Sequence, residues 1–508
     1  MAVGQHNLAR LGEETFKRLG DHESLLFEGA WHRSGELYER ARRLAGGLIE
    51  LGVAPGDRVV VFMANSPDVG VAYWALWRAG AAITPAIFLL PPEELRHVVS
   101  DSGARAVITS PEFLGIARQA VEGLPDLKWI ICAGPEQEGA ISLSSLENTE
   151  PVEIVDREDS DLAALLYTGG TTGRAKGVML SHENLWFSTK SLHAHGNRED
   201  TDRVLVPLPL SHAFGLLVTI LGMHAERPGI AALQRWFDPT DFLTLIQEHK
   251  LQIATVVPSM IQILLSQPLE DYDLTSLQYL GCGAAPLPRE VAEDFLKRVP
   301  WVQIREGYGC TESGAVMSAN KPREGKLGSV GTPIAGYELR ILDDDGKDVQ
   351  QGQPGEICCR SKGVMMGYWN APEATAATIK DGWLYTGDIG YVDEDGYLYV
   401  VDRKKDLIIR GGFNVFPRDV EDALLEHPAV AMAGVVGRPD KAKGEEVVAF
   451  VSLKPGLGVT EEELITFAKT KLSAYKYPRE IHIVPAVPLT PVMKVDRKVL
   501  RTMLGQYA

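Results

Sequence analysis

A glycine- and hydroxyl-rich stretch within residues 165–185 carries the groups in this chain that are best suited to bind an anion. Its centre reads Thr168-Gly169-Gly170-Thr171-Thr172-Gly173, and Arg174 and Lys176 follow. Glycines let backbone N–H groups approach an anion closely, hydroxyls add donors and cations balance the charge, so such a loop suits phosphate. A plain glycine-rich turn between strands explains the composition about as well. The Walker spacing is not met, because Gly177 follows Lys176 where Ser or Thr should stand, and this disfavours a P-loop nucleotide triphosphatase.

The composition indicates an ordinary globular enzyme with more than one domain. The chain has 508 residues, beyond the roughly 100–200 of one domain. Its net charge of −17 argues against a nucleic-acid binder, and its five cysteines form no C-x-x-C pair that would indicate a zinc ribbon. The first twenty residues are polar, and no window approaches the ~20 apolar residues of a membrane span. We therefore expect a cytoplasmic enzyme without a transmembrane segment.

The elements that position the loop follow from the hydrophobic pattern. Short apolar runs alternate with helical segments over the first 300 residues, as in the strand 58–63, the helix 68–79 and the strand 104–109. This alternation predicts an α/β fold with mostly parallel sheets flanked by helices. After about Glu338, glycine turns separate short strands, which predicts an antiparallel portion that closes a large domain.

A second, smaller unit is predicted from Arg403 onward. Helical and strand patterns alternate there on a smaller scale, and Thr460 with Glu463 forms a capping box before an apolar run. The pattern predicts a large domain over residues 1–402 and a small α+β domain over residues 403–508.

The glycine-rich stretch resembles the phosphate loop of the adenylate-forming superfamily, which contains acyl-CoA synthetases, adenylation domains and luciferases. That loop usually reads Tyr-Thr-Ser-Gly-Thr-Thr-Gly-x-Pro-Lys-Gly. Here Gly169-Gly170 stands for Ser-Gly and Ala175 stands for the proline. Further motifs extend the resemblance over nearly the whole chain. It implies a distorted, barrel-like antiparallel portion in the large domain and a mobile C-terminal domain.

The motif around residues 207–215 resembles the acyl site of this family. Taken alone, His212 is more often a satisfied structural residue than a functional one. The resemblance implies that His212 is an aromatic gate beside the acyl carboxylate. Adenylation domains for α-amino acids place an aspartate near here, whereas this chain has Ala213-Phe214. An uncharged acyl α-position is therefore expected.

Two further motifs resemble the nucleotide-binding segments of the family, although each could also be an ordinary turn or a solvated surface. By the resemblance, Tyr308 stacks on adenine, Thr311 contacts the α-phosphate, and Glu312 ligates Mg²⁺, a cation that prefers carboxylate oxygen. The residues expected around the nucleotide in these motifs are Gly283, Ala284, Ala285, Glu306, Gly307, Tyr308, Gly309 and Thr311.

The remaining motifs lie near the predicted domain junction and the C-terminus. The resemblance implies that Asp388 and Arg403 hold the ribose, that Lys405 is the pivot of the small domain, and that Gly411 and Gly412 line a pantetheine tunnel after rotation. A charged run and a hairpin turn would explain these residues equally simply. Near the end of the chain, Lys494 matches the lysine that completes the adenylation site, and Met493 stands where glycine is usual.

The implied reaction joins a carboxylic acid to ATP and then to coenzyme A. Lys176 and the loop hydroxyls, Thr172 among them, would hold the β- and γ-phosphates, and Lys494 would bridge the acid and the α-phosphate. Pyrophosphate leaves, and a thiol then displaces AMP. The apolar candidate pocket suits a hydrophobic acid, a medium- or long-chain fatty acid or an aryl acid. Transfer of the acyl group to a carrier protein and a non-catalytic nucleotide-binding role stay as alternatives, and the oligomeric state stays open, a homodimer included.

Overall fold

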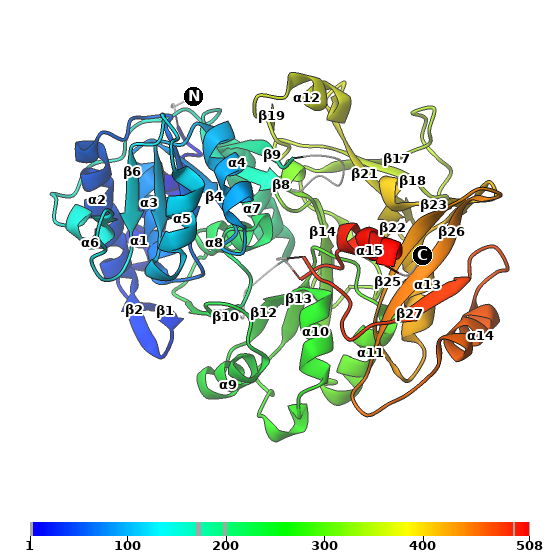
Figure 1. Cartoon of the computed structure of the whole chain (residues 1–508). Helices are drawn as coiled ribbons and strands as arrows, with labels where there is room; N and C mark the ends of the chain where they lie inside the picture. Colours follow the sequence, from blue (N-terminus) through cyan, green and yellow to red (C-terminus); the bar gives the residue numbers. More distant parts are fainter. Residues whose placement is uncertain (1–3, 169–173, 197–200, 491–492, 507–508) are drawn as a thin grey trace.

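The computed structural model describes residues 4–168, 174–196, 201–490 and 493–506. Figure 1 shows a large lobe, coloured blue to yellow, and a smaller lobe in orange and red at the C-terminal end. Helices flank mostly parallel sheets in the large lobe, and the small lobe mixes helices with a mostly antiparallel sheet. The predicted fold class is confirmed.

The first sheet has the strand order β19-β9-β8-β4-β3-β5-β6-β7, and its inner strands are parallel. In β3 (Arg58–Phe62), Val59 and Val61 face one core, whereas Val60 and Phe62 face another. Burial on both faces is typical of a parallel sheet between helix layers. Its other strands are β4 (Ala82–Pro85), β5 (Ala106–Thr109), β6 (Trp129–Cys132), β7 (Ile141–Ser142), β8 (Leu162–Thr168), β9 (Lys176–Ser181) and β19 (Gly367–Tyr368).

Helices cover both faces of this sheet. The core around Val59 includes buried residues of α1, α2 and α3, and the core around Val60 includes those of α4 and α5. The helices are α1 (Leu8–Leu19), α2 (Ser34–Leu51), α3 (Pro67–Arg78), α4 (Pro92–Ser102), α5 (Leu114–Val121), α6 (Leu143–Leu146) and α7 (His182–Gly196).

The second sheet has the order β16-β15-β14-β13-β12-β10-β11-β1-β2 and is parallel from β1 to β14. The carboxyl ends of its parallel strands meet at one edge, where open α/β sheets bind ligands. Its strands are β1 (Glu23–Phe27), β2 (Ala30–Arg33), β10 (Arg203–Val206), β11 (Ile230–Leu233), β12 (Ile253–Val256), β13 (Tyr279–Cys282), β14 (Gln303–Tyr308), β15 (Ser318–Ala319) and β16 (Thr332–Pro333), and its helices are α8 (Ala213–Gly222), α9 (Pro239–His249), α10 (Pro258–Leu265) and α11 (Arg289–Arg298).

The third sheet is antiparallel, as the glycine-separated short strands after Glu338 predict. The register of its strands β21 and β22 places Asp388 opposite Arg403. The sheet consists of β17 (Glu338–Leu342), β18 (Gly355–Arg360), β20 (Ile379–Lys380), β21 (Trp383–Val392) and β22 (Leu398–Arg403), and α12 (Pro372–Thr378) lies beside it.

The small lobe is built on a sheet in the order β24-β23-β26-β25, with β27 beside β26. The capping box is confirmed, because Thr460 accepts a hydrogen bond from the Glu463 N–H and the Glu463 carboxylate accepts one from the Thr460 N–H. The elements are β23 (Ile408–Arg410), β24 (Phe413–Val415), α13 (Pro417–Leu425), β25 (Val430–Asp440), β26 (Gly444–Leu453), α14 (Glu461–Lys471), β27 (Glu480–Ile483) and α15 (Arg497–Met503).

At the end of β22, where the sequence predicts the domain junction, a short turn, Lys404–Asp406, follows Arg403. The division of the chain at residues 402 and 403 stays a prediction. Among the described residues, no helix combines the length and the apolarity needed to cross a lipid bilayer.

Candidate active site

The centre of the site is a buried carboxylate, Asp388, on β21. The Tyr308 hydroxyl at the end of β14 donates to its Oδ2 over 2.7 Å, and Arg403 Nε lies 3.3 Å from Oδ1. Burial raises the pKa of Asp388 above its ordinary value, although the Arg403 cation and the Tyr308 hydroxyl act against that rise. A carboxylate can accept about four hydrogen bonds, so these two contacts leave capacity for a vicinal diol.

The Lys494 ammonium reaches this centre from the C-terminal end of the chain. Burial and the nearby Arg403 cation lower the pKa of Lys494 to about 8, and Asp388 acts in the opposite direction. The loop that carries Lys494 is closed by hydrogen bonds between Thr490 and Lys494, and Ser259 Oγ at the start of α10 donates to the Met493 carbonyl over 2.7 Å. The structure thus brings Arg403 into contact with Asp388 and places Lys494, about 90 positions further along the chain, within the field of the same carboxylate.

His212 caps α8, and its ring lies within the field of the Lys494 cation. Its Nδ1 accepts a hydrogen bond from the Phe214 N–H over 3.2 Å, which leaves the ring proton on Nε2. Burial and the Lys494 cation lower the pKa of His212 to about 3. The ring is therefore neutral near pH 7, and it can face a carboxylate without adding a second cation to the site.

Glu312 lies in the short turn Thr311–Ser313 and is held by a residue that the sequence reasoning missed. The Tyr368 hydroxyl on β19 donates to Glu312 Oε1 over 2.8 Å, and Lys176 Nζ lies 5.0 Å from the centre of the same ring. Tyr368 gave no signal in the sequence, because it belongs to a two-residue strand far along the chain. It connects the predicted phosphate lysine with the predicted metal ligand.

The glycine-rich turns let the strands β13 and β14 approach closely. A Cβ on Gly309 would lie 2.4 Å from the Ala315 carbonyl oxygen, and one on Gly283 would lie 3.1 Å from that of Gly307. Ala284 has a positive φ of 69° and precedes Ala285 in the turn after β13. Gly309 therefore has no room for a side chain whether or not a base lies against it, and the part of these residues in nucleotide binding stays a prediction.

Glu306 has a different environment from its predicted neighbours. Its carboxylate accepts a hydrogen bond from the Gly328 N–H over 2.9 Å, and burial raises its pKa to about 7. The side chain therefore anchors the segment near Gly328, and a direct contact with nucleotide stays a prediction.

The predicted pivot and the predicted tunnel residues lie in different surroundings. Burial and the Arg403 cation lower the pKa of Lys405, and the carboxylates Asp388 and Glu312 oppose this, so Lys405 lies within the field of the site. The structure does not bring Gly411 and Gly412 to the site. They turn the β23–β24 hairpin with φ values of 59° and 83°, and a Cβ on either would meet no atom within 4 Å.

The phosphate loop lies in part outside the described residues. Thr168 ends β8, and Lys176 begins β9 directly opposite it. The predicted residues Gly169, Gly170, Thr171, Thr172 and Gly173 all fall between the described segments.

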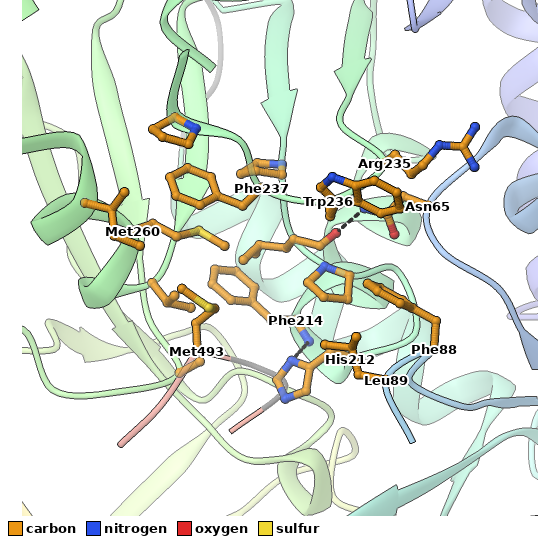
Figure 2. A pocket seen from close by; sticks show the side chains of 17 residues that line it. Asn65, Phe88, Leu89, His212, Phe214, Arg235, Trp236, Phe237, Met260 and Met493 are labelled. Atoms are coloured by element: carbon orange, nitrogen blue, oxygen red, sulfur yellow. Dashed lines mark hydrogen bonds between the residues drawn. The ribbon is translucent and has the colours of Figure 1, made fainter. Parts of the chain in front are cut away.

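A cavity of about 250 Å³ adjoins His212 and the C-terminal loop. Figure 2 shows Phe214, Met260 and Met493 gathered on one side of it, with Trp236 and Asn65 on the other. The motif around residues 207–215, which the sequence predicts to form the acyl site, contributes Pro207, Leu208, Pro209, His212 and Phe214 to the lining. The lining residues are Asn65, Phe88, Leu89, Pro207, Leu208, Pro209, His212, Phe214, Arg235, Trp236, Phe237, Pro239, Val257, Met260, Ile263, Ala284 and Met493.

Comparisons with known proteins agree with this arrangement. The profile of the family described as AMP-binding enzyme matches residues 12–369, and that of the AMP-binding enzyme C-terminal domain matches residues 419–494. The 4-coumarate–CoA ligase 5 of Oryza sativa subsp. japonica is 38% identical over 97% of this chain and 94% of its own length, and the long-chain-fatty-acid–CoA ligase of Escherichia coli O157:H7 is 34% identical over the same shares. The crystal structure of the anthranilate CoA ligase AuaEII with anthranoyl-AMP superposes with a TM-score of 0.92 at 27% identity, covering 99% of this chain and 98% of that one.

Proposed function

This chain belongs to the AMP-binding enzyme family within the adenylate-forming superfamily, and we propose that it is an acyl-CoA ligase that activates a hydrophobic carboxylic acid with ATP. The observation that carries the proposal is the position of the Lys494 ammonium. Its charge acts on both the Asp388–Arg403 pair and His212, and its chain neighbour Met493 lines an apolar cavity together with His212. A cation between a nucleotide-binding carboxylate and an acid pocket is placed to join an acid to a phosphate.

In the first half-reaction, one oxygen of the acid's carboxylate attacks the α-phosphorus of ATP, and the bond to pyrophosphate breaks. The acid is already ionised near pH 7, so charge compensation and alignment are the main tasks. Lys494 bridges the carboxylate and the α-phosphate while negative charge builds up, and neutral His212 borders the carboxylate. Asp388 and Arg403 hold the ribose, and Lys176 holds the β- and γ-phosphates.

Mg²⁺ fits this arrangement through Glu312. No cluster of three or more His, Cys, Asp or Glu side chains that could hold a metal occurs in the described part of the chain, so a metal here would rest on one carboxylate and on phosphate oxygens and waters. When bound, the ion would neutralise charge on the phosphates. Tyr368 would fix the Glu312 carboxylate through its hydroxyl.

In the second half-reaction, the sulfur of CoA attacks the acyl carbon, the bond to AMP breaks and the thiol proton leaves. In the proposed mechanism, Lys494 would then block the approach of the thiol to the acyl carbon. We propose that the small domain, residues 403–508, rotates about Lys405, withdraws Lys494 and brings Gly411 and Gly412 to a pantetheine tunnel. Such a movement is a common rate-limiting step.

The experiment that tests the proposal is a pyrophosphate-release screen with ATP and Mg²⁺. Linear acids of graded length, benzoic acids and arylpropenoic acids are offered with and without CoA. We expect AMP and acyl-CoA to form with at least one apolar acid. Acyl-AMP that accumulates with CoA but is consumed by a phosphopantetheinylated carrier protein would favour the carrier-loading alternative, and no exchange with any acid would favour a non-catalytic nucleotide-binding protein.

The pH dependence of adenylation follows from Lys494. The pKa of Lys494 is lowered to about 8 in the free enzyme, so the side chain is an ammonium below that pH and a neutral amine above it. We expect kcat/KM for ATP to fall as the pH rises through about 8, because kcat/KM reports the free enzyme. Bound phosphates stabilise the ammonium, so kcat should begin to fall at a higher pH than kcat/KM does. Pyrophosphate exchange from pH 6.5 to 10 measures both kcat/KM and kcat. If the two fell at the same pH, the assignment of this pH dependence to Lys494 would be contradicted.

The metal assignment predicts a specific defect in Glu312→Gln. The substitution keeps the shape and the contact with Tyr368 but removes the charge, so half-maximal adenylation should need at least roughly 10-fold more Mg²⁺. Titration of Mg²⁺ at saturating ATP measures this. Tyr368→Phe is the matched control, because it removes the hydroxyl and leaves the carboxylate; we expect a smaller shift in the same direction.

A further inference from the structure

Met493 has a backbone conformation that most side chains avoid. Its φ is 60°, in the left-handed region, at a position where the motif usually carries glycine. Glycine adopts this conformation without steric cost, and methionine does not. The chain therefore keeps the glycine-like turn that presents Lys494 and carries a long side chain in it as well.

This side chain points into the cavity. Met493 lines the cavity together with Phe214, Met260 and Ala284, and it packs against the core of α10 and β13 (Figure 2). The hydrogen bond from Ser259 to its carbonyl fixes the backbone at the same place. The thioether is thus held in position by the large lobe, although it belongs to the C-terminal end of the chain.

Met493 differs in origin from the other described residues of the lining. All of those lie between Asn65 and Ala284, whereas Met493 lies next to the lysine that must leave before the thiol attacks. A cavity of about 250 Å³ is small for a ligand site, where roughly 300–1,000 Å³ is usual, so one methionine side chain decides much of its size.

We propose that Met493 is a specificity-determining residue for the acid, acting in the adenylation step only. This inference rests on the proposed function. With the small lobe closed, the thioether narrows the acid cavity and favours acids with a slim apolar group. When the lobe rotates, this wall leaves together with Lys494. Acid selection is thereby tied to the conformation that forms the adenylate.

The test compares side-chain size with backbone freedom at this position. Met493→Gly and Met493→Ala both remove the thioether, but only glycine also removes the steric cost of the positive φ. Met493→Leu keeps apolar bulk. Leu457→Ala is the matched control in the same lobe, because Leu457 is an exposed leucine in a turn of the small lobe outside the cavity lining. Each variant is assayed by ATP–pyrophosphate exchange over the same acids, and by single-turnover reaction of purified acyl-AMP with CoA.

We expect glycine and alanine to raise kcat/KM for bulky acids relative to slim ones by roughly 10-fold or more, since one methylene in an apolar pocket already gives 10–200-fold discrimination. Leucine should stay near the wild type, and so should the reaction of acyl-AMP with CoA in every variant. The inference would be overturned if the glycine and alanine variants ranked the acids by kcat/KM as the wild type does. It would also be overturned if one of these variants favoured bulky acids and the other favoured slim acids. Absence of acid-dependent exchange in the wild type would instead remove the proposed function, and the inference with it.

Discussion

Replacement of Lys494 by alanine is expected to slow adenylation by roughly 10²–10³-fold, the usual effect of removing one donor that stabilises transition-state charge. The ammonium acts on both His212 and the Asp388–Arg403 pair, and the loop before α15 brings it to the site. The measurement is ATP–pyrophosphate exchange at saturating acid. Attack of CoA on purified acyl-AMP should proceed at the wild-type rate or faster, because the side chain that occupies the thiol's approach is gone.

Two further variants separate charge from structure. Lys498→Ala removes a lysine from the first turn of α15, outside the site, and should leave both half-reactions unchanged. Lys494→Gln keeps the length but not the charge and should resemble alanine. Equal losses in both half-reactions of Lys494→Ala would indicate a structural role for the loop, and an unaffected exchange rate would refute the mechanism.

Asp388→Ala should lower kcat/KM for ATP by about 100-fold, which corresponds to roughly 3 kcal/mol for hydrogen bonds to a charged acceptor. The Asp388 side chain is 10% exposed, and its carboxylate accepts a hydrogen bond from Tyr308 while it pairs with Arg403. Its loss removes the ribose acceptor and leaves a buried hydroxyl and a cation unpaired. The unfolding temperature should therefore fall as well, and it is measured in parallel.

Deoxyribose nucleotides isolate the ribose contact from this structural damage. The wild type should discriminate against 2′-deoxy- and 3′-deoxy-ATP, and Asp388→Ala should lose that discrimination, because the acceptor for the missing hydroxyl is gone. Asp388→Asn, which keeps an oxygen for Tyr308, is the control for folding. Undiminished discrimination in Asp388→Ala would show that the ribose is held elsewhere.

The sequence predicted the central strands and the class of the fold well. A strand is predicted at residues 58–63, because a turn precedes this short apolar run and a helix that begins with proline follows it. The observed strand, Arg58–Phe62, ends one residue earlier. In a chain where strands and helices alternate, a short apolar run between two helices is most simply a buried strand. The antiparallel portion and the capping box of α14 were likewise readable from local residue types.

The contacts of the site depend on information that local patterns do not contain. The pairing of Asp388 with Arg403 follows from the register of β21 and β22, and register is set by strand pairing over a distance. Tyr368 reaches Glu312 only because a two-residue strand joins β9 at the edge of another sheet. Met493 was recognisable as unusual, but the direction of its side chain required the packing of two lobes.

A cavity whose wall is shared between distant parts of one polypeptide also constrains protein engineering. Grafting residues 403–508 onto another ligase would transfer Met493 together with Lys494. Under the proposal for Met493, the recipient's preference among carboxylic acids would then change, although no residue of its own large lobe had been substituted. The acid specificity of such a chimeric enzyme should therefore be measured directly, because neither parent enzyme predicts it.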